Sequence, residues 1–247
     1  MAQRRPADAG LIAPSRRLLL AAAAVLPAAC AGSGVPAPSA PVPAPRVRIG
    51  DRWRYRIVDR LNGRWLDEPS FEVEAVDPAI VLRVTSRKPG PPREERFVGA
   101  WSVLQEWVYG AKLTFDEPVP LLPSPIAAGG GSRTVTGYRE GEEPRRYRWS
   151  QSLSTQGWES VEVPAGRYDC LRVARTIGFT STDTGRGVSS RTDTLWYAPA
   201  VNRWVQREWR GDFVSAGLGD NPAEGILAME DRLLWQLTAY IPTPTAR

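Results

Sequence analysis

Apolar and polar residues alternate along most of the chain after residue 47, in short runs separated by turn residues. In residues 52–59, RWRYRIVD, the side chains of Trp53, Tyr55 and Ile57 fall on one face and arginines fall on the other. A period of two is typical of β-strands with one buried face. Asn62-Gly63 follows, a dipeptide that favours the positive φ angles of a tight hairpin, so the pattern predicts a strand and then a turn.

Runs of the same kind recur to the end of the chain and predict about ten antiparallel strands. A helical period is not convincing anywhere, although residues 222–230 could form one short turn of helix. We therefore expect a mainly β fold with little helix. The expected architecture is a single curved antiparallel sheet that forms an open half β-barrel.

Residues 115–132, FDEPVPLLPSPIAAGGGS, interrupt the alternation. Their four prolines should exclude the segment from a central strand, because proline cannot donate a ladder hydrogen bond. Their apolar side chains still need cover, so we expect the segment to lie across the sheet or its mouth. Leu121, Leu122 and Ile126 are therefore the candidate lid, or the candidate loop that touches a membrane.

The first 30 residues predict an export signal. Arg16-Arg17 precedes an apolar run from Leu18 to Ala29, which has the length of a signal-peptide core and is too short to span a bilayer. The arginine pair resembles a twin-arginine export motif, with leucine where phenylalanine is usual. The twin-arginine route and the general secretory route both remain open.

The end of this segment, Leu26-Pro27-Ala28-Ala29-Cys30, resembles a bacterial lipobox, which implies that Cys30 is lipidated and becomes the mature N-terminus. Plain cleavage near an Ala-x-Ala sequence is the alternative. Ala31 stands where an inner-membrane retention signal would have aspartate, so the resemblance implies the periplasmic face of the outer membrane. Residues 31–46 are rich in proline and alanine and predict an extended tether, and residues 47–247 predict a single β-rich periplasmic domain.

The net charge of the predicted mature chain is small. Four arginines and one aspartate fall in residues 1–30, which leaves 28 basic and 26 acidic residues and a net charge of +2. A basic surface for nucleic acid is therefore not indicated. The predicted partners are a membrane, through the lipid anchor, and a lipid or a lipoprotein; the sequence identifies no protein partner.

The chain contains no histidine, which removes the usual nucleophilic triads and histidine-ligated metal sites. We expect no cofactor, no metal and no catalytic residue. Glu94-Glu95 and Glu142-Glu143 are adjacent carboxylates that we interpret as solvated loop charge, although a cell-wall enzyme with two facing carboxylates is a third possible reading. Cys170 fits a buried strand position as a small apolar residue, and a reactive or intermolecular thiol is the other reading.

Ten tryptophans are spread over nearly every predicted strand. Large aromatic side chains could simply fill the concavity of a sheet that few helices cover. Alternatively, some could line a cavity for an acyl chain or form a platform for sugar rings. The candidate lining residues are Trp53, Tyr55, Trp101, Trp149, Trp196 and Trp235.

VPAGRYDCLRV, residues 163–173, is followed by TLWYAPAVNRWVQRE, residues 194–208, and by a closing LLWQLTAY. This order resembles a group of uncharacterised bacterial periplasmic domains, in which a Val-Pro-Ala-Gly turn opens one strand and Trp-Tyr-Ala-Pro opens the return of the next. The group is similar in shape to the Lol lipoprotein carrier and receptor proteins, LolA and LolB, which implies an incomplete barrel around an apolar cavity.

These observations favour a non-enzymatic lipoprotein anchored in the outer membrane, which binds or transfers an apolar ligand in the concavity of a half-barrel. The alternative is a structural or assembly module of the cell envelope with a filled core and no ligand.

Overall fold

The computed structural model describes residues 35–38, 42–108, 110–180, 186–215 and 226–244. The predicted signal segment, the lipobox with Cys30 and part of the predicted tether lie outside these residues. Within them, no helix is both long and apolar enough to cross a membrane. The only described helix is the three-residue 3-10 turn η1, Pro199–Val201.

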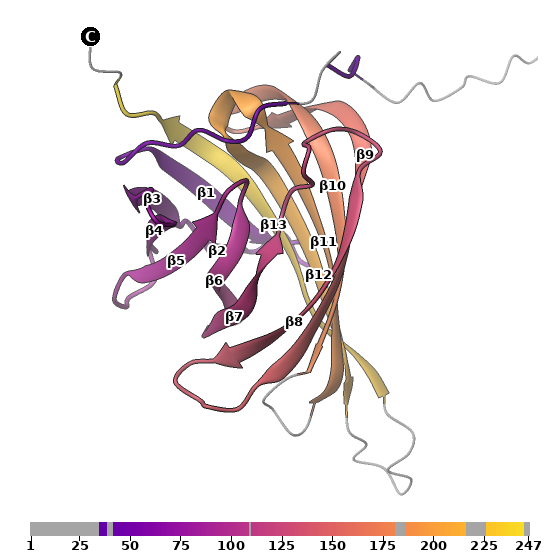
Figure 1. Cartoon of the computed structure of the whole chain (residues 1–247). Helices are drawn as coiled ribbons and strands as arrows, with labels where there is room; N and C mark the ends of the chain where they lie inside the picture. Colours follow the sequence, from indigo (N-terminus) through magenta and orange to yellow (C-terminus); the bar gives the residue numbers. More distant parts are fainter. Residues whose placement is uncertain (1–34, 39–41, 109, 181–185, 216–225, 245–247) are drawn as a thin grey trace, which may run out of the picture. The chain divides into compact units, whose positions relative to one another are not determined.

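Thirteen strands form one antiparallel sheet (Figure 1). They are β1 Arg52–Asp59, β2 Trp65–Asp67, β3 Ser70–Ala75, β4 Ile80–Thr85, β5 Arg93–Val98, β6 Ser102–Val108, β7 Ala111–Pro120, β8 Gly131–Glu140, β9 Tyr147–Val163, β10 Gly166–Thr180, β11 Arg186–Ala198, β12 Arg203–Ser215 and β13 Ile226–Ile241.

The sheet closes on itself, so the prediction of an open half-barrel is wrong. β1 pairs with β13 from Arg52↔Ile241 to Asp59↔Leu233, and this pairing joins twelve strands into a closed barrel with β2 added on β1. Closure removes the unpaired edges that an open sheet would leave. β1 and β13 lie at opposite ends of the domain's sequence. The alternation within a strand does not indicate which other strand it pairs with, so this pairing could not be predicted from the pattern.

The strands of the barrel differ in length. β9 to β13 have 13 to 17 residues each, whereas β1 to β6 have three to eight. The long strands run along the barrel and continue beyond the short ones, which cross them at an angle (Figure 1). β-bulges at Arg54/Tyr55, Arg172/Val173 and Gly211/Asp212 add local twist, which helps the sheet to curve around its interior.

The proline-rich segment begins as a strand, which corrects part of its prediction. Pro118 and Pro120 belong to β7, but β8 pairs with β7 only from Leu113 to Phe115. The two prolines lie beyond this short seam, where β7 has no partner on the β8 side and a missing N–H breaks no ladder. The segment leaves the sheet after Pro120.

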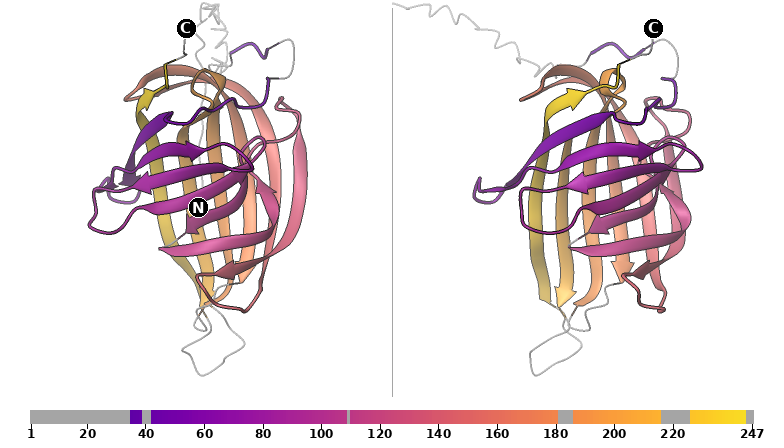
Figure 2. Two further views of the ribbon diagram at one scale, coloured as in Figure 1. Left: turned by 60° about the vertical axis from the view of Figure 1, so that its left-hand side comes forward. Right: turned by 90° about the vertical axis from the view of Figure 1, so that its left-hand side faces the viewer.

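One end of the barrel is covered by segments that are distant in the sequence. Residues 121–126 turn inward after β7, and the Val42 N–H donates a 3.0 Å hydrogen bond to the Ile126 carbonyl. η1 joins β11 to β12 at the same end, which we call the capped end. The chain before β1 and the end of β13 also meet there, where the Thr243 N–H donates to Asp51 Oδ1 (Figure 2).

Candidate functional site

A cavity of about 250 Å³ opens where the short strands end and β12 and β13 continue. We call it the rim pocket. Its aromatic walls are Phe71 from β3, Trp107 from β6, Trp209 from β12 and Trp235 from β13. Its polar lining residues are Asp67, Ser86, Lys88, Arg93, Glu95 and Asp231. Mouths of β-barrels are common sites for small ligands, whose pockets range from about 300 to 1,000 Å³, so this cavity is a small one.

The rings that form the aromatic walls pack against one another, and one of their hydrogen-bond donors has no partner. The Trp235 ring lies 5.7 Å from Trp209 and 6.3 Å from Phe71, centroid to centroid. Trp209 Nε1 donates a 2.9 Å hydrogen bond to Asp231 Oδ2. By contrast, Trp235 Nε1 is buried and has no hydrogen-bond partner. Because Trp235 lines the pocket, a ligand oxygen that reached Nε1 would satisfy this donor, whose burial without a partner has an energetic cost.

Glu95 places a titratable carboxyl in the same pocket. Burial raises the pKa of Glu95 to about 7, a rise that Arg203 opposes and Glu106 assists. Near neutral pH this carboxyl can therefore either donate or accept a hydrogen bond. The interpretation of Glu95 as solvated loop charge is wrong, because β5 turns it inward while Glu94 pairs with Arg96 outside.

A charged network fills the middle of the barrel. Asp193 accepts a 2.6 Å bond from Arg175 Nη1 and bonds of 2.9 and 2.7 Å from Arg207 Nε and Nη2. The remaining Arg175 donors bind Gln151 Oε1, and Gln151 in turn donates to the Pro120 carbonyl. Burial alone would raise the pKa of Asp193, but Arg207 and Arg175 outweigh it and lower that pKa to about 2. The network is therefore ionised and mutually satisfied.

Two further arginines are buried without hydrogen bonds. The Arg203 guanidinium lies between 4.3 and 5.8 Å from the rings of Trp53, Tyr55, Phe71, Trp101 and Trp204. Burial lowers its pKa. Arg191 lies 4.7 Å from the Trp209 ring and 3.8 Å from Glu106 Oε1. Both groups make cation–π contacts, and those with Phe71 and Trp209 couple them to the walls of the rim pocket.

The predicted lining residues separate into three locations. Of the six, only Trp235 borders the rim pocket. Trp53, Tyr55, Trp101 and Trp149 are fully buried in the core. Trp196 faces the opposite side of the sheet from Leu195 and Tyr197, where the Arg172 guanidinium lies 5.5 Å from its ring and its Nε1 donates to Glu159.

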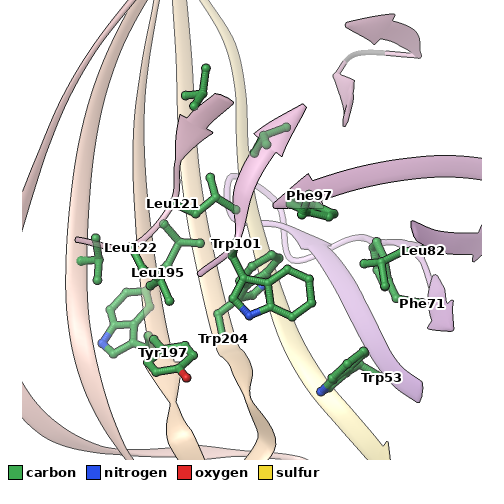
Figure 3. Packing of buried hydrophobic residues seen from close by; sticks show 14 of the residues in the cluster. Trp53, Phe71, Leu82, Phe97, Trp101, Leu121, Leu122, Leu195, Tyr197 and Trp204 are labelled. Carbon is green, nitrogen blue, oxygen red and sulfur yellow. The ribbon is translucent and has the colours of Figure 1, made fainter. Parts of the chain in front are cut away.

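The predicted lid residues are packed inside the capped end. Leu121, Leu122 and Ile126 are no more than 3% exposed. Figure 3 shows Leu121 and Leu122 beside Trp101 and Leu195. The Leu121 N–H also donates to the Trp101 carbonyl. These side chains close one end of the barrel from inside, and none of them is presented to a membrane.

The structure favours the interpretation of Cys170 as a small apolar residue buried in the core. Its side chain is fully buried and forms no disulfide. Burial, together with the carboxylates of Asp169 and Glu159, raises the pKa of its thiol to about 12. Since the thiolate is the reactive form, this environment suppresses nucleophilic chemistry. No grouping of three or more potential metal ligands occurs among the residues that the structure describes.

The alternation of residues along a strand could have predicted which charged side chains point into the barrel. On β5, Glu95 shares its face with the apolar Phe97; on β11, Asp193 shares its face with Leu195. In-register polar residues among apolar ones indicate a polar interior. No comparable pattern in the sequence predicts the closure of the barrel, which brings β13 and its Trp235 beside β1.

No protein-family model matches the chain, and no curated protein matches it. Two solved structures are similar in fold. One is described as "a putative lipoprotein" from Parabacteroides distasonis, with 14% identity and a TM-score of 0.47, covering 80% of this chain and 97% of that one. The other, from Bacteroides fragilis, is described as "a putative exported protein with YmcC-like fold", with 12% identity, a TM-score of 0.48 and coverage of 82% and 100%. The likeness concerns the fold alone, and the resemblance to the Lol proteins stays a prediction.

Proposed function

We propose that this chain is a non-catalytic binding protein of the cell envelope, and that it holds a small ligand in the rim pocket. The observation that carries the proposal is the combination of four aromatic walls with the unpartnered Trp235 Nε1 and the inward Glu95 carboxyl. Small-molecule sites combine aromatic walls with polar groups that fix the orientation of the ligand, and the rim pocket has both.

The lining defines the chemistry of the ligand. The rings of Trp209 and Trp235 favour a flat or ring-shaped apolar face, and Trp235 Nε1 favours an acceptor oxygen beside it. Glu95 can bind a hydroxyl group in either protonation state. The ion network around Asp193 occupies the middle of the barrel, so we propose a small amphipathic molecule rather than an acyl chain threaded through the interior.

The cellular location belongs to the same proposal and rests on the sequence. Lipidation at Cys30 would attach the chain to the periplasmic face of the outer membrane, with the membrane as its partner through the anchor. The export motif leaves the twin-arginine and general secretory routes open.

The competing function is an envelope assembly module that binds no small molecule. The filled interior supports it, because the Arg175–Asp193–Arg207 network and the rings around Arg203 occupy much of the barrel. Such a barrel would serve as a rigid scaffold, and its rim pocket would hold only solvent.

The experiment that decides between these two functions fills the rim pocket with a larger side chain. Leu233 lines it, whereas the neighbouring Leu234 does not and lies on the opposite face of β13. The full chain would be purified in detergent from bacterial envelopes and analysed by native mass spectrometry, with organic extraction of any bound molecule. We expect Leu233→Trp to lose the bound mass and the matched Leu234→Trp to keep it. A wild-type protein without a bound small molecule would favour the assembly module, and turnover of the extracted molecule by the pure protein would overturn the non-catalytic assignment.

A further inference from the structure

A second cavity, of about 480 Å³, lies at the capped end. It is bordered by residues 42–48, by η1 and by the end of β13, and we call it the cap cradle. It shares no lining residue with the rim pocket, so a ligand bound in the cap cradle is independent of the proposed function.

The segment that forms one wall of the cap cradle is held in place by backbone hydrogen bonds. The Val42 N–H donates to the Ile126 carbonyl at 3.0 Å, the Arg46 N–H to Asn202 Oδ1 at 3.2 Å, and the Arg48 N–H to Asp51 Oδ2 at 2.9 Å. Three separate anchors over seven residues fix the backbone that carries Arg46 and Arg48.

The charge in the cap cradle is predominantly positive. Arg46 and Arg48 both line it and are exposed. Asp51 is its only acidic lining residue among those described, and its two carboxylate oxygens already accept the Arg48 and Thr243 backbone N–H groups. The Asp51 carboxylate thus holds the backbone of this segment, and together with the two guanidinium groups it gives the lining a net charge of +1, from two positive groups and one negative group.

A buried donor without a partner adds an independent indication of a ligand. Tyr197 is fully buried, lines the cap cradle and has a hydroxyl with no hydrogen-bond partner. Burial raises its pKa, so the hydroxyl stays protonated and able to donate. Buried polar groups in proteins are nearly always paired, and the cavity beside this hydroxyl is where an acceptor can reach it.

We propose that the cap cradle binds a phosphate-bearing ligand, with Arg46 and Arg48 holding the phosphate oxygens and the Tyr197 hydroxyl orienting them. Guanidinium groups match phosphate oxygens in geometry and charge, and charge-assisted bonds of this kind are the strong ones. Val42, Pro43 and Pro242 supply an apolar flank for the organic part of the ligand. The phosphate could belong to an anionic phospholipid headgroup or to a soluble phosphate ester.

The test uses the full chain in detergent and two defined probes. Native mass spectrometry would compare adducts of phosphatidylglycerol with adducts of phosphatidylcholine, and calorimetry would titrate glycerol 3-phosphate. The key variant is Arg46→Glu/Arg48→Glu. Its matched control is Arg133→Glu/Arg139→Glu, which makes the same charge change at two exposed arginines on β8.

We expect the Arg46/Arg48 variant to lose binding at least tenfold and the control variant to bind normally. Tyr197→Phe keeps the ring that packs in the core and should weaken binding by about tenfold, as expected for one hydrogen bond to a charged group. Binding of phosphatidylglycerol would identify a headgroup site, and binding of glycerol 3-phosphate alone would identify a soluble ester. The proposal is overturned if neither probe binds, or if both arginine variants bind equally well.

Discussion

Trp53 and Trp235 lie on the two strands that close the barrel, yet their environments differ. Trp53 on β1 is fully buried at the capped end, and its Nε1 donates a 2.8 Å hydrogen bond to the Val201 carbonyl. Trp235 on β13 is partly exposed in the rim pocket, and its Nε1 has no partner. A satisfied indole is explained by structure alone, whereas an unsatisfied one beside a cavity points to a ligand.

At the capped end most donors of the aromatic cluster are used by the structure, although Trp204 Nε1 is buried there without a hydrogen-bond partner. Trp101 has a φ of 59° and donates from Nε1 to the carbonyl of Asn202, which itself has a φ of 54°. A bulky residue with positive φ is strained, so its surroundings must hold it there. The Tyr55 hydroxyl likewise donates to the Trp204 carbonyl. The number of tryptophans therefore says little about ligand binding, and the partners of each one say more.

The largest effect should come from the charged network between these two regions. Asp193→Ala would leave Arg175 and Arg207 buried without their shared carboxylate, and should lower the free energy of unfolding by about 3–5 kcal/mol. Urea denaturation would measure the loss. Asp169→Ala, at an exposed position, is the control and should change stability by less than about 0.5 kcal/mol. Equal losses in the two variants would contradict the role given to the network.

Trp53→Phe sharpens the comparison at the capped end. The change removes part of a buried ring and leaves the Val201 carbonyl without its donor, so we expect a loss of about 2–3 kcal/mol in unfolding free energy. Urea denaturation monitored by circular dichroism would measure it. A loss below about 0.5 kcal/mol would show that the satisfied indole is not structural.

Glu95 should make stability depend on pH. Its pKa is raised to about 7 in the folded state, so the folded chain holds this proton above the pH at which the unfolded chain releases it. The contribution is therefore fully present below the ordinary glutamate pKa and is lost as pH rises through about 7. Because the side chain is partly exposed, the loss should be on the order of 1–2 kcal/mol. The measurement is the free energy of unfolding at pH 5 and pH 8, where Glu95→Gln should remove this component; an unchanged difference would refute the assignment.

Trp235→Phe should have the smallest effect on stability. The Trp235 N–H makes no hydrogen bond, so its removal sacrifices none, and the ring stays in contact with the pocket. We expect a change within about 1 kcal/mol in urea denaturation. A loss as large as that of Trp53→Phe would mean that Trp235 is also a structural residue.

Much of the local structure could be predicted from the sequence, because alternation is a property of each strand by itself. The pattern predicts β1, β3 and β4, and Gly63 adopts the positive φ that its turn requires. Residues 96–110 read as one largely apolar run, but the structure divides them between the end of β5 and β6, which a tight turn at residues 99–101 joins. Global features were harder to predict: barrel closure and the capped end depend on contacts between distant segments.

The candidate site was predictable only in part for the same reason. Trp235 is among the predicted lining residues, but its neighbours Glu95, Phe71 and Trp209 come from three other strands. The buried arginines have no distinguishing signal, because arginine is abundant throughout the chain. Their burial depends on the partners that the closed barrel supplies, such as Asp193 for Arg207.

The most direct test is to measure stability and ligand occupancy together in Trp53→Phe and Trp235→Phe. Each full-length variant would be purified from envelopes, weighed by native mass spectrometry for bound small molecules and unfolded in urea. We expect opposite outcomes: Trp53→Phe loses stability and keeps the ligand, whereas Trp235→Phe keeps stability and loses the ligand. If Trp235→Phe retains the same bound molecule at wild-type occupancy, the assignment of the rim pocket as the binding site is contradicted.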